Sequence, residues 1–253
     1  MIFPGRFAGR VAVVTGGADG IGRAVAGRIA VEGGIVAIFD INDRLMDQAR
    51  AELSKDCPGA MAVRVDITDE DQVRKGMAHV AGRTGRVDIM VNCAGVPGPN
   101  NVGILDYSAA EFERVCRINL HGAFLVSKYA LERMKERDYG RILLISSIGG
   151  KEGNPGMIGY AASKSGVIGL VKGLGKEFAR TGIRINGLAP AVIRTALLDA
   201  VAPEQLKYMT DKIPMGRVGT VEETAALSAW IVSEECSFTT GFVFDLSGGR
   251  ATY

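Results

Sequence analysis

Short runs of consecutive apolar residues alternate along the chain with longer stretches in which apolar and polar residues mix at helical spacing. A run that is apolar at successive positions predicts a strand buried on both faces, whereas strict alternation would predict a strand with one solvated face. The predicted strands are 10–15, 35–40, 60–66, 87–92, 141–146, 183–188 and 241–245. The predicted helices are 20–32, 43–55, 69–84, 108–137, 157–181 and 221–233.

Regular alternation of strands and helices predicts an α/β fold with a doubly wound, parallel, seven-stranded sheet and helices on both faces. No linker rich in Ser, Pro or Gly and no block of charge interrupts the pattern, so residues 1–253 are expected to form a single domain. The only long irregular piece is expected at 189–220, which carries three prolines.

Composition and charge narrow the range of partners. Thirty basic residues stand against 28 acidic ones, and a net charge of +2 is too balanced for a protein that binds nucleic acid. No apolar run approaches the roughly 20 residues that span a bilayer, and the N-terminus lacks the features of a signal peptide. We therefore expect a cytoplasmic protein that binds neither nucleic acid nor a membrane.

The four cysteines lie far apart without a C-x-x-C pair, and the chain has two histidines. Neither a zinc site nor a disulfide framework has that spacing. We predict no metal site. Because a free thiol behaves mostly as a small buried hydrophobe, all four cysteines are assigned to packing: Cys57, Cys93, Cys116 and Cys236.

A glycine-rich turn follows the first predicted strand and opens the first helix. Gly16, Gly20 and Gly22 would let the backbone approach a pyrophosphate, which the free N–H groups and dipole of a helix N-terminus attract. Their spacing differs from the common G-x-G-x-x-G fingerprint, so the turn alone also fits a purely structural role. Asp40 follows at the end of the second predicted strand, where a carboxylate can accept hydrogen bonds from ribose hydroxyls.

Two acidic residues near this turn bear on the choice of cofactor. Asp40 would repel a 2′-phosphate, and Asp19 adds negative charge where a phosphate-binding base would otherwise stand. The sequence therefore predicts NAD rather than NADP.

A second polar group lies in the middle of the chain. Tyr160 and Lys164 are spaced i and i+4 on one helical face, and an adjacent cation would lower the pKa of the phenol, as a general acid/base near neutral pH requires. Ser147 ends the fifth strand, where its hydroxyl could hydrogen-bond a carbonyl or alcohol oxygen. Alone, the Tyr160–Lys164 pair also fits a surface contact, and Asn119 also fits a solvated helix position.

These motifs together resemble the short-chain dehydrogenase/reductase family over nearly the whole chain. The segment TGGADGIG at 15–22 is similar to the cofactor turn of that family. Asp66-Ile67 resembles its adenine contact, and Asn92-Cys93-Ala94-Gly95 resembles its N-N-A-G segment. The catalytic tetrad of the family falls on Asn119, Ser147, Tyr160 and Lys164.

The resemblance implies a Rossmann fold and a hydride transfer to or from a nicotinamide cofactor, with no metal. It implies that Tyr160 exchanges a proton with the substrate oxygen, and that Lys164 lowers the tyrosine pKa and holds the nicotinamide ribose. Ser147 would stabilise charge on the substrate oxygen, and Asn119 would position a water that links Lys164 to solvent. The cofactor contacts that it implies are Gly16, Asp19, Gly20, Ile21, Gly22, Asp40, Asp66, Ile67, Asn92, Ala94, Gly95, Tyr160, Lys164, Ile193 and Thr195.

The chain departs from the family pattern at two places. Cys93 replaces the usual second Asn, which affects packing more than chemistry. Pro190-Ala191 replaces Pro-Gly after the sixth strand, so this turn should avoid a positive φ at residue 191.

Three classes of function are compatible with this resemblance. The first is an NAD-dependent dehydrogenase of a small polar substrate such as a sugar, a polyol or a sugar acid, with oxidation of a 2-keto-3-deoxy sugar acid at C4 as the specific likeness. The second is a reductase similar to 3-oxoacyl-acyl-carrier-protein reductase, against which Asp19 and Asp40 argue. The third is a nucleotide-sensing binding protein, against which the intact tetrad argues. Substrate contacts are expected from Ser147 and Tyr160 and from the variable segments 148–158 and 189–220.

The C-terminal tail and the long helices suggest how the subunits assemble. By family resemblance we expect a homotetramer with dimer faces on the helices at 108–137 and 157–181. The tail, 246–253, would lie near the active site of a neighbouring subunit, where Arg250 could bind the carboxylate of an acidic substrate through its planar fork. A tail that only buries Tyr253 and tightens the tetramer is the alternative.

Overall fold

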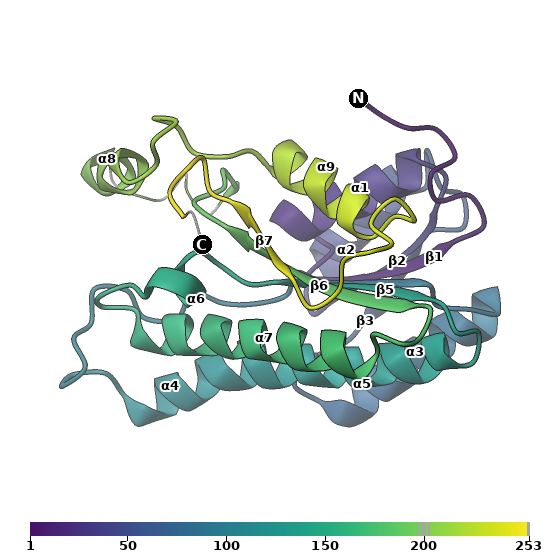
Figure 1. Cartoon of the computed structure of the whole chain (residues 1–253), viewed down its shortest axis with the longest axis horizontal. Coiled ribbons are helices and arrows are strands. Elements are labelled where there is room, and N and C mark those ends of the chain that lie inside the picture. The colour runs from purple at the N-terminus through teal and green to yellow at the C-terminus, as the bar shows by residue number, and fades with distance from the viewer. Residues whose placement is uncertain (197, 199–200, 202, 252–253) are drawn as a thin grey trace.

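The computed structural model describes residues 1–196, 198, 201 and 203–251, and its centre is one parallel sheet (Figure 1). All neighbouring strands pair in parallel in the order β3-β2-β1-β4-β5-β6-β7, which confirms the predicted doubly wound, seven-stranded sheet. The strands are β1 (Val11–Thr15), β2 (Ile35–Asp40), β3 (Met61–Arg64), β4 (Ile89–Asn92), β5 (Gly140–Ile145), β6 (Ile183–Pro190) and β7 (Val243–Leu246).

Helices cover both faces of the sheet, as predicted. Figure 1 shows α1, α2 and α9 on one side and α3, α5 and α7 on the other. The bounds are α1 (Gly20–Val31), α2 (Asp43–Leu53), α3 (Glu70–Thr84), α4 (Ala109–Cys116), η1 (Arg117–His121), α5 (Gly122–Lys135), α6 (Gly149–Glu152), α7 (Ile158–Glu177), α8 (Pro203–Asp211) and α9 (Val221–Ile231).

Apolar burial on each face explains why the consecutive apolar runs became strands. Every residue of β1, β4 and β5 is buried, and successive side chains point into different cores. Val13 packs in the core beneath α3, α5 and α7, whereas its neighbours Ala12 and Val14 pack in the core beneath α1, α2 and α9.

The structure corrects three boundaries. The segment 189–220 is not all irregular, because it contains α8, and Ile193 pairs with Gly219 through an isolated parallel bridge. The predicted helix 108–137 contains a π-helical turn, η1, between α4 and α5. The short helix α6 was not predicted, since its four residues include two glycines and carry no periodic pattern.

The strand order places a crevice at the carboxyl ends of β1 and β4. The chain reverses its winding direction between these two strands, and ligands of doubly wound folds bind where the order reverses. The turns that follow β1, β4 and β5 all open at this edge of the sheet, because all strands are parallel. Within the described ranges, no helix is both long and apolar enough to cross a membrane.

Candidate active site

A cleft with a volume of about 690 Å³ opens at this edge of the sheet. It brings together side chains and turns that are distant in the sequence, from Gly16 after β1 to Thr195 beyond β6. The predicted residues that line it are Gly16, Asp19, Gly20, Ile21, Gly22, Asp40, Asp66, Ile67, Ala94, Gly95, Ser147, Tyr160, Lys164, Ile193 and Thr195.

The turn after β1 depends on its glycines for close backbone contacts. Gly16 has a φ of +61°, and a Cβ there would lie 2.9 Å from the backbone of Ala94. A Cβ on Gly22 would lie 2.1 Å from the carbonyl oxygen of Gly16, so no other residue fits without a shift of the turn. Asp19 is the N-cap of α1 and accepts a hydrogen bond of 2.7 Å from the N–H of Gly20. The turn is therefore a cradle of the shape that a pyrophosphate requires.

Asp40 is held at the end of β2 by backbone donors. Its Oδ1 accepts hydrogen bonds from the N–H groups of Ile41 at 2.8 Å and Asn42 at 3.1 Å. Its Oδ2 accepts a weaker bond of 3.3 Å from the N–H of Ala18 in the glycine turn. The carboxylate thus bridges the turn and the second strand, where it can accept from ribose hydroxyls and repel a 2′-phosphate.

Tyr160, Ser147 and Lys164 meet at the carboxyl end of β5. The hydroxyls of Tyr160 and Ser147 are hydrogen-bonded to each other, and Ser147 Oγ also accepts a bond of 3.0 Å from the N–H of Gly149. Lys164 is 5% exposed and donates from Nζ to the carbonyl oxygen of Ile145 at 2.8 Å. Its Nζ lies 5.9 Å from the centroid of the Tyr160 ring. Lys164 is buried, and Tyr160 and Ser147 are half-buried at the wall of the cleft, so the reading of Tyr160 and Lys164 as a surface contact is wrong.

The electrostatics of this group correct one expectation. Burial raises the pKa of Tyr160 above its ordinary value, and the hydrogen bond with Ser147 lowers it by a smaller amount. Burial also lowers the pKa of Lys164 to about 8, partly offset by the nearby Cys93 thiol. Desolvation of the phenolate therefore opposes the lowering that was expected, and Tyr160 is a neutral phenol that can donate a proton.

Asn119 supports the site from behind the cleft rather than lining it. It is 1% exposed in η1, so it is not a solvated helix position. Its Oδ1 accepts from the N–H of Val96 at 2.8 Å, and its Nδ2 donates to the carbonyl oxygen of Val96 at 2.9 Å and to Ser163 Oγ at 3.0 Å. Ser163 Oγ in turn donates to the carbonyl oxygen of Tyr160 at 2.8 Å. Asn119 thus connects the loop after β4 to the backbone that carries Tyr160.

Asn92 is likewise buried behind the cleft. Its Oδ1 accepts a hydrogen bond of 2.6 Å from Thr15 Oγ1, and the same hydroxyl accepts a bond of 3.3 Å from the N–H of Ala94. Asn92 therefore ties the ends of β1 and β4 together below the cleft. It shapes the cofactor site without lining it.

The cysteines divide into two kinds. Cys57 and Cys236 are buried, as expected for packing residues, whereas Cys93 and Cys116 are only partly covered. Cys93 also lines the cleft, and burial of its thiol raises the pKa to about 12, so it stays neutral. Cys93 therefore packs against the core beneath α1, α2 and α9, as predicted, and also faces the cleft. At the second departure from the family pattern, Ala191 does not have a positive φ, as predicted.

Several residues of the cleft were not predicted from the sequence. Arg114 and Arg117 reach its rim from α4 and η1, although both elements come well before β5 and Ser147 in the chain. No motif signals them, because exposed arginines on a helix are common. Val96 and Pro97 line the cleft just beyond the Asn92–Gly95 segment, and extension of that motif could have found them.

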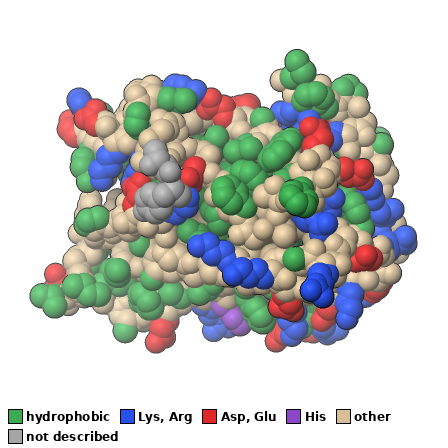
Figure 2. All heavy atoms as spheres, viewed as in Figure 1, with side chains coloured by type: hydrophobic (Ala, Val, Ile, Leu, Met, Phe, Trp, Pro, Cys, Tyr) green, Lys and Arg blue, Asp and Glu red, His purple; other side chains and the backbone are tan. Residues whose placement is uncertain are grey.

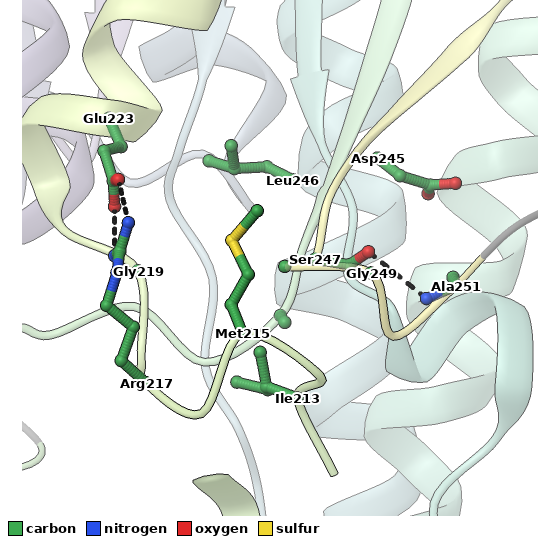
Figure 3. Close-up of a pocket in the computed structure, with 12 residues that line it drawn as sticks. Ile213, Met215, Arg217, Gly219, Glu223, Asp245, Leu246, Ser247, Gly249 and Ala251 are labelled. Carbon is green, nitrogen blue, oxygen red and sulfur yellow. Dashed lines mark hydrogen bonds and ion pairs between the residues drawn. The ribbon is translucent and has the colours of Figure 1, made fainter.

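A separate hollow of about 420 Å³ lies between the loop after α8 and the end of β7 (Figure 3). Met215 projects into it between Leu246 and Ile213, as Figure 3 shows. Its charged lining groups are all paired: Arg217 binds both carboxylate oxygens of Glu223, at 2.9 and 2.6 Å, and Asp245 accepts from Lys151 at 2.9 Å. The hollow therefore offers an apolar wall rather than an unpaired charge.

Arg250 is bound within its own chain. Its Nε and Nη2 donate to Oε2 of Glu152 at 2.9 and 2.7 Å, and Nη2 lies 3.5 Å from Oδ1 of Asn154. A reach across a subunit interface would require this ion pair to break. The alternative expectation, that the tail buries Tyr253, concerns a residue outside the described part of the chain. The described part of the chain also contains no group of three or more His, Cys, Asp or Glu arranged to hold a metal.

Comparison with known proteins gives matches along nearly the whole chain. The family model described as enoyl-(acyl carrier protein) reductase matches residues 16–251. A 2-dehydro-3-deoxy-L-rhamnonate dehydrogenase (NAD(+)) from Sphingomonas sp. (strain SKA58) is 44% identical over 252 residues, covering 100% of this chain and 99% of that protein. A 3-oxoacyl-acyl-carrier-protein reductase from Thermotoga maritima is 35% identical, with 96% of this chain and 98% of that protein covered. The crystal structure of levodione reductase superimposes with a TM-score of 0.92 at 33% identity, covering 98% of this chain and 100% of that chain.

Proposed function

The chain belongs to the short-chain dehydrogenase/reductase family, and we propose that it is an NAD-dependent oxidoreductase acting on a secondary alcohol or ketone of a small polar substrate. One observation carries this proposal: the hydrogen-bonded hydroxyls of Tyr160 and Ser147 share a cleft with the carboxylate of Asp40. Tyr160 and Ser147 can transfer a proton to or from a C–OH group, and Asp40 in the same cleft can accept hydrogen bonds from the ribose of a dinucleotide.

The cleft suits NAD in its shape and charge. The glycine turn leaves no space for side chains where the pyrophosphate would lie, and Asp40 and Asp66 carry carboxylates along the same cleft. We assign the cofactor contacts to the predicted residues that line the cleft. Asn92 does not line the cleft and supports the cofactor site from below by tying β1 to β4. When bound, NAD supplies the acceptor for the hydride from the substrate carbon.

The side chains around the reacting oxygen divide the remaining work. Tyr160 takes the alcohol proton in oxidation and returns it in reduction. Ser147 donates a hydrogen bond to the same oxygen and stabilises the charge that develops on it. Lys164 holds the nicotinamide ribose with its ammonium, and Asn119 fixes the backbone of Tyr160 through Ser163. Tyr160 must be a phenolate to take the alcohol proton, and burial raises its pKa. The positive charge that oxidised nicotinamide carries would favour the phenolate when the cofactor is bound.

We assign the substrate to sugars, polyols or sugar acids, with a 2-keto-3-deoxy sugar acid oxidised at C4 as the specific candidate. The 44% identical relative, which is named for a 2-dehydro-3-deoxy sugar acid and for NAD(+), supports this choice. The second candidate is a 3-oxoacyl-acyl-carrier-protein reductase, favoured by the relative from Thermotoga maritima. Asp40 disfavours it, because reductive biosynthesis in this family commonly uses NADPH.

A substrate panel tests this proposal. The purified protein is given NAD with sugars, polyols, aldonates and 2-dehydro-3-deoxy-L-rhamnonate, and NADH formation is followed by absorbance. A parallel assay supplies NADPH with an acetoacetyl thioester. We expect turnover with a member of the sugar-acid group and none with the thioester. Turnover of the thioester alone would replace the first candidate by the second.

We also propose that one domain carries both the cofactor and substrate sites, and that the protein works as a homotetramer in the cytoplasm. Apolar side chains exposed on the outer helices support the assembly: Phe112 on α4 is 37% exposed, Phe124 on α5 44% and Ile158 on α7 40%. Phe242 beside the edge strand β7 is 54% exposed and packs edge-on against Phe244, at 4.8 Å between ring centroids. Figure 2 shows hydrophobic side chains gathered over α9 and β7.

A further inference from the structure

The short helix α6, which follows Ser147 in the chain, has little stability of its own. It spans four residues, Gly149–Glu152, two of which are glycines, and Gly153 directly after it has a φ of +75°. A single helical turn makes too few hydrogen bonds to offset the conformational entropy that it loses, and glycine adds to that cost. The position of α6 is therefore determined by the parts of the molecule that it contacts.

On its inner side, α6 contacts two residues of the catalytic tetrad. The N–H of Gly149 donates a hydrogen bond of 3.0 Å to Ser147 Oγ. Gly150 lies so close to α7 that a Cβ there would be 2.7 Å from the backbone of Lys164. The carbonyl oxygen of Gly150 also accepts a bond of 2.6 Å from Ser165 Oγ. A movement of α6 would therefore change the surroundings of both Ser147 and Lys164.

The hydrogen bond from Gly149 orients the hydroxyl of Ser147. A hydroxyl has one hydrogen to donate and two lone pairs that can accept. Because the N–H of Gly149 occupies one lone pair, the hydrogen of Ser147 is left for Tyr160 or for a substrate oxygen in the cleft that both hydroxyl residues line. A displacement of α6 would remove this N–H and release the Ser147 hydroxyl from that orientation.

On its outer side, α6 is fastened to the C-terminal end of the chain by two ion pairs. Lys151 Nζ lies 2.9 Å from both carboxylate oxygens of Asp245. Arg250 donates from Nε and Nη2 to Oε2 of Glu152, at 2.9 and 2.7 Å. Side-chain exposures are 13% and 23% in the first pair and 11% and 26% in the second. Because these charges are partly shielded from water, the pairs restrain the helix more than open surface pairs would.

The two partners at the C-terminal end are themselves held in place. Asp245 belongs to β7, where it pairs with Ala189 of β6. Arg250 stands in a turn that is closed by two hydrogen bonds of 3.2 Å, from its own N–H to the carbonyl oxygen of Ser247 and from the N–H of Ala251 to Ser247 Oγ. The ion pairs therefore connect α6 to the edge of the sheet through two fixed points.

We propose that Asp245 and Arg250 are positioning residues for the reaction, because their ion pairs hold α6 where the N–H of Gly149 orients the hydroxyl of Ser147. The inference rests on the proposed function, in which Ser147 donates to the reacting oxygen. It gives Arg250 a task within its own chain, distinct from binding a substrate carboxylate across an interface. The four charged side chains of the two pairs lie outside the lining of the cleft, so their removal should slow the chemical step and leave NADH affinity unchanged.

The test measures kcat and KM with NAD and with the best neutral and the best acidic substrate of the panel. Arg250→Ala, Glu152→Gln and Asp245→Asn each remove one ion pair and should lower kcat about two- to tenfold with both substrates, the range for loss of one neutral hydrogen bond. Arg250→Lys keeps the charge and should keep most of kcat. An unchanged kcat in the first three variants, or an effect of Arg250→Ala confined to KM for the acidic substrate, would overturn the inference.

Glu234→Gln is the matched control, because Glu234 pairs with Arg10 at the amino-terminal end of β1, the edge of the sheet opposite the cleft. It should leave kcat unchanged. Fluorescence titration should give the wild-type NADH affinity in every variant, and an equal loss of kcat and NADH affinity would contradict a positioning role.

Hydrogen–deuterium exchange separates the two proposals, because it needs no substrate. Exchange in peptides that cover residues 147–153 should be faster in Glu152→Gln and Arg250→Ala than in wild type, and unchanged in Glu234→Gln. Unchanged exchange in the first two variants would refute the restraint of α6. A wild type that forms no NADH with any panel member would instead overturn the proposed function, and the positioning role with it, even where exchange changes as expected.

Discussion

At the residue scale, the structure gives Tyr160 and Lys164 unusual electrostatic surroundings. Lys164 is buried and Tyr160 is half-buried beside Ser147. Burial moves both pKa values toward the neutral form, upward for the phenol and downward for the ammonium. Groups shifted in this way and gathered in a cleft mark a functional site more clearly than either residue alone.

Tyr160→Phe should lower kcat by more than about a hundredfold, because it removes the only group assigned to proton transfer. The ring remains, so the dissociation constant for NADH should stay within about fivefold of wild type, since a typical neutral hydrogen bond contributes only about 1 kcal/mol. Steady-state kinetics and fluorescence titration measure the two effects. Residual activity above one hundredth of wild type would show that another group is the acid/base.

NADH binding should weaken as the pH rises through about 8, the pKa of Lys164. Below that pH the side chain is an ammonium that can donate charge-assisted hydrogen bonds to the ribose hydroxyls, and above it the charge is lost. Titrations across this range should show the dissociation constant rising about tenfold, and Lys164→Met should bind weakly at every pH without that rise. The same pH dependence in Lys164→Met would assign the titration to another group.

At the scale of elements, the parts predicted best were those with a strong local pattern. The buried strands follow from runs of consecutive apolar residues. The turn at Gly16–Gly22 follows from its glycines, because a Cβ there would collide with neighbouring backbone. The π turn of η1 and the short helix α6 were missed, because hydrogen-bond register and tertiary contacts set them rather than periodicity. The contact between Arg250 and Glu152 was missed for a related reason: its two residues are 98 positions apart.

Two glycines of α1 provide a matched pair for testing the turn. Gly22→Ala places a Cβ 2.1 Å from the carbonyl oxygen of Gly16 and should lower both the melting temperature and NADH affinity. Gly27→Ala meets nothing within 4 Å and should stabilise the helix by about 0.5–1 kcal/mol. Calorimetry and fluorescence titration distinguish them. Equal effects of the two substitutions would contradict the account of the turn.

At the scale of the whole molecule, light scattering should give four times the 26.8 kDa mass of one chain. Phe242→Asp should reduce the mass of the assembly, because it places a charge in the exposed apolar surface over α9 and β7, and circular dichroism should show that the fold is kept. A conservative Phe242→Leu serves as the control. A wild-type mass of a single chain at micromolar concentration would refute the tetramer.

The central claim is that this cleft selects NAD for oxidation of a small polar alcohol. Its most direct test is the ratio of kcat/KM for NAD over NADP in wild type, with the best substrate of the panel. We expect this ratio to be at least tenfold, equivalent to about 1.4 kcal/mol, because the carboxylate of Asp40 repels a 2′-phosphate. Asp40→Ala combined with Asp19→Arg should lower the ratio. Equal or better catalysis by wild type with NADP would contradict it.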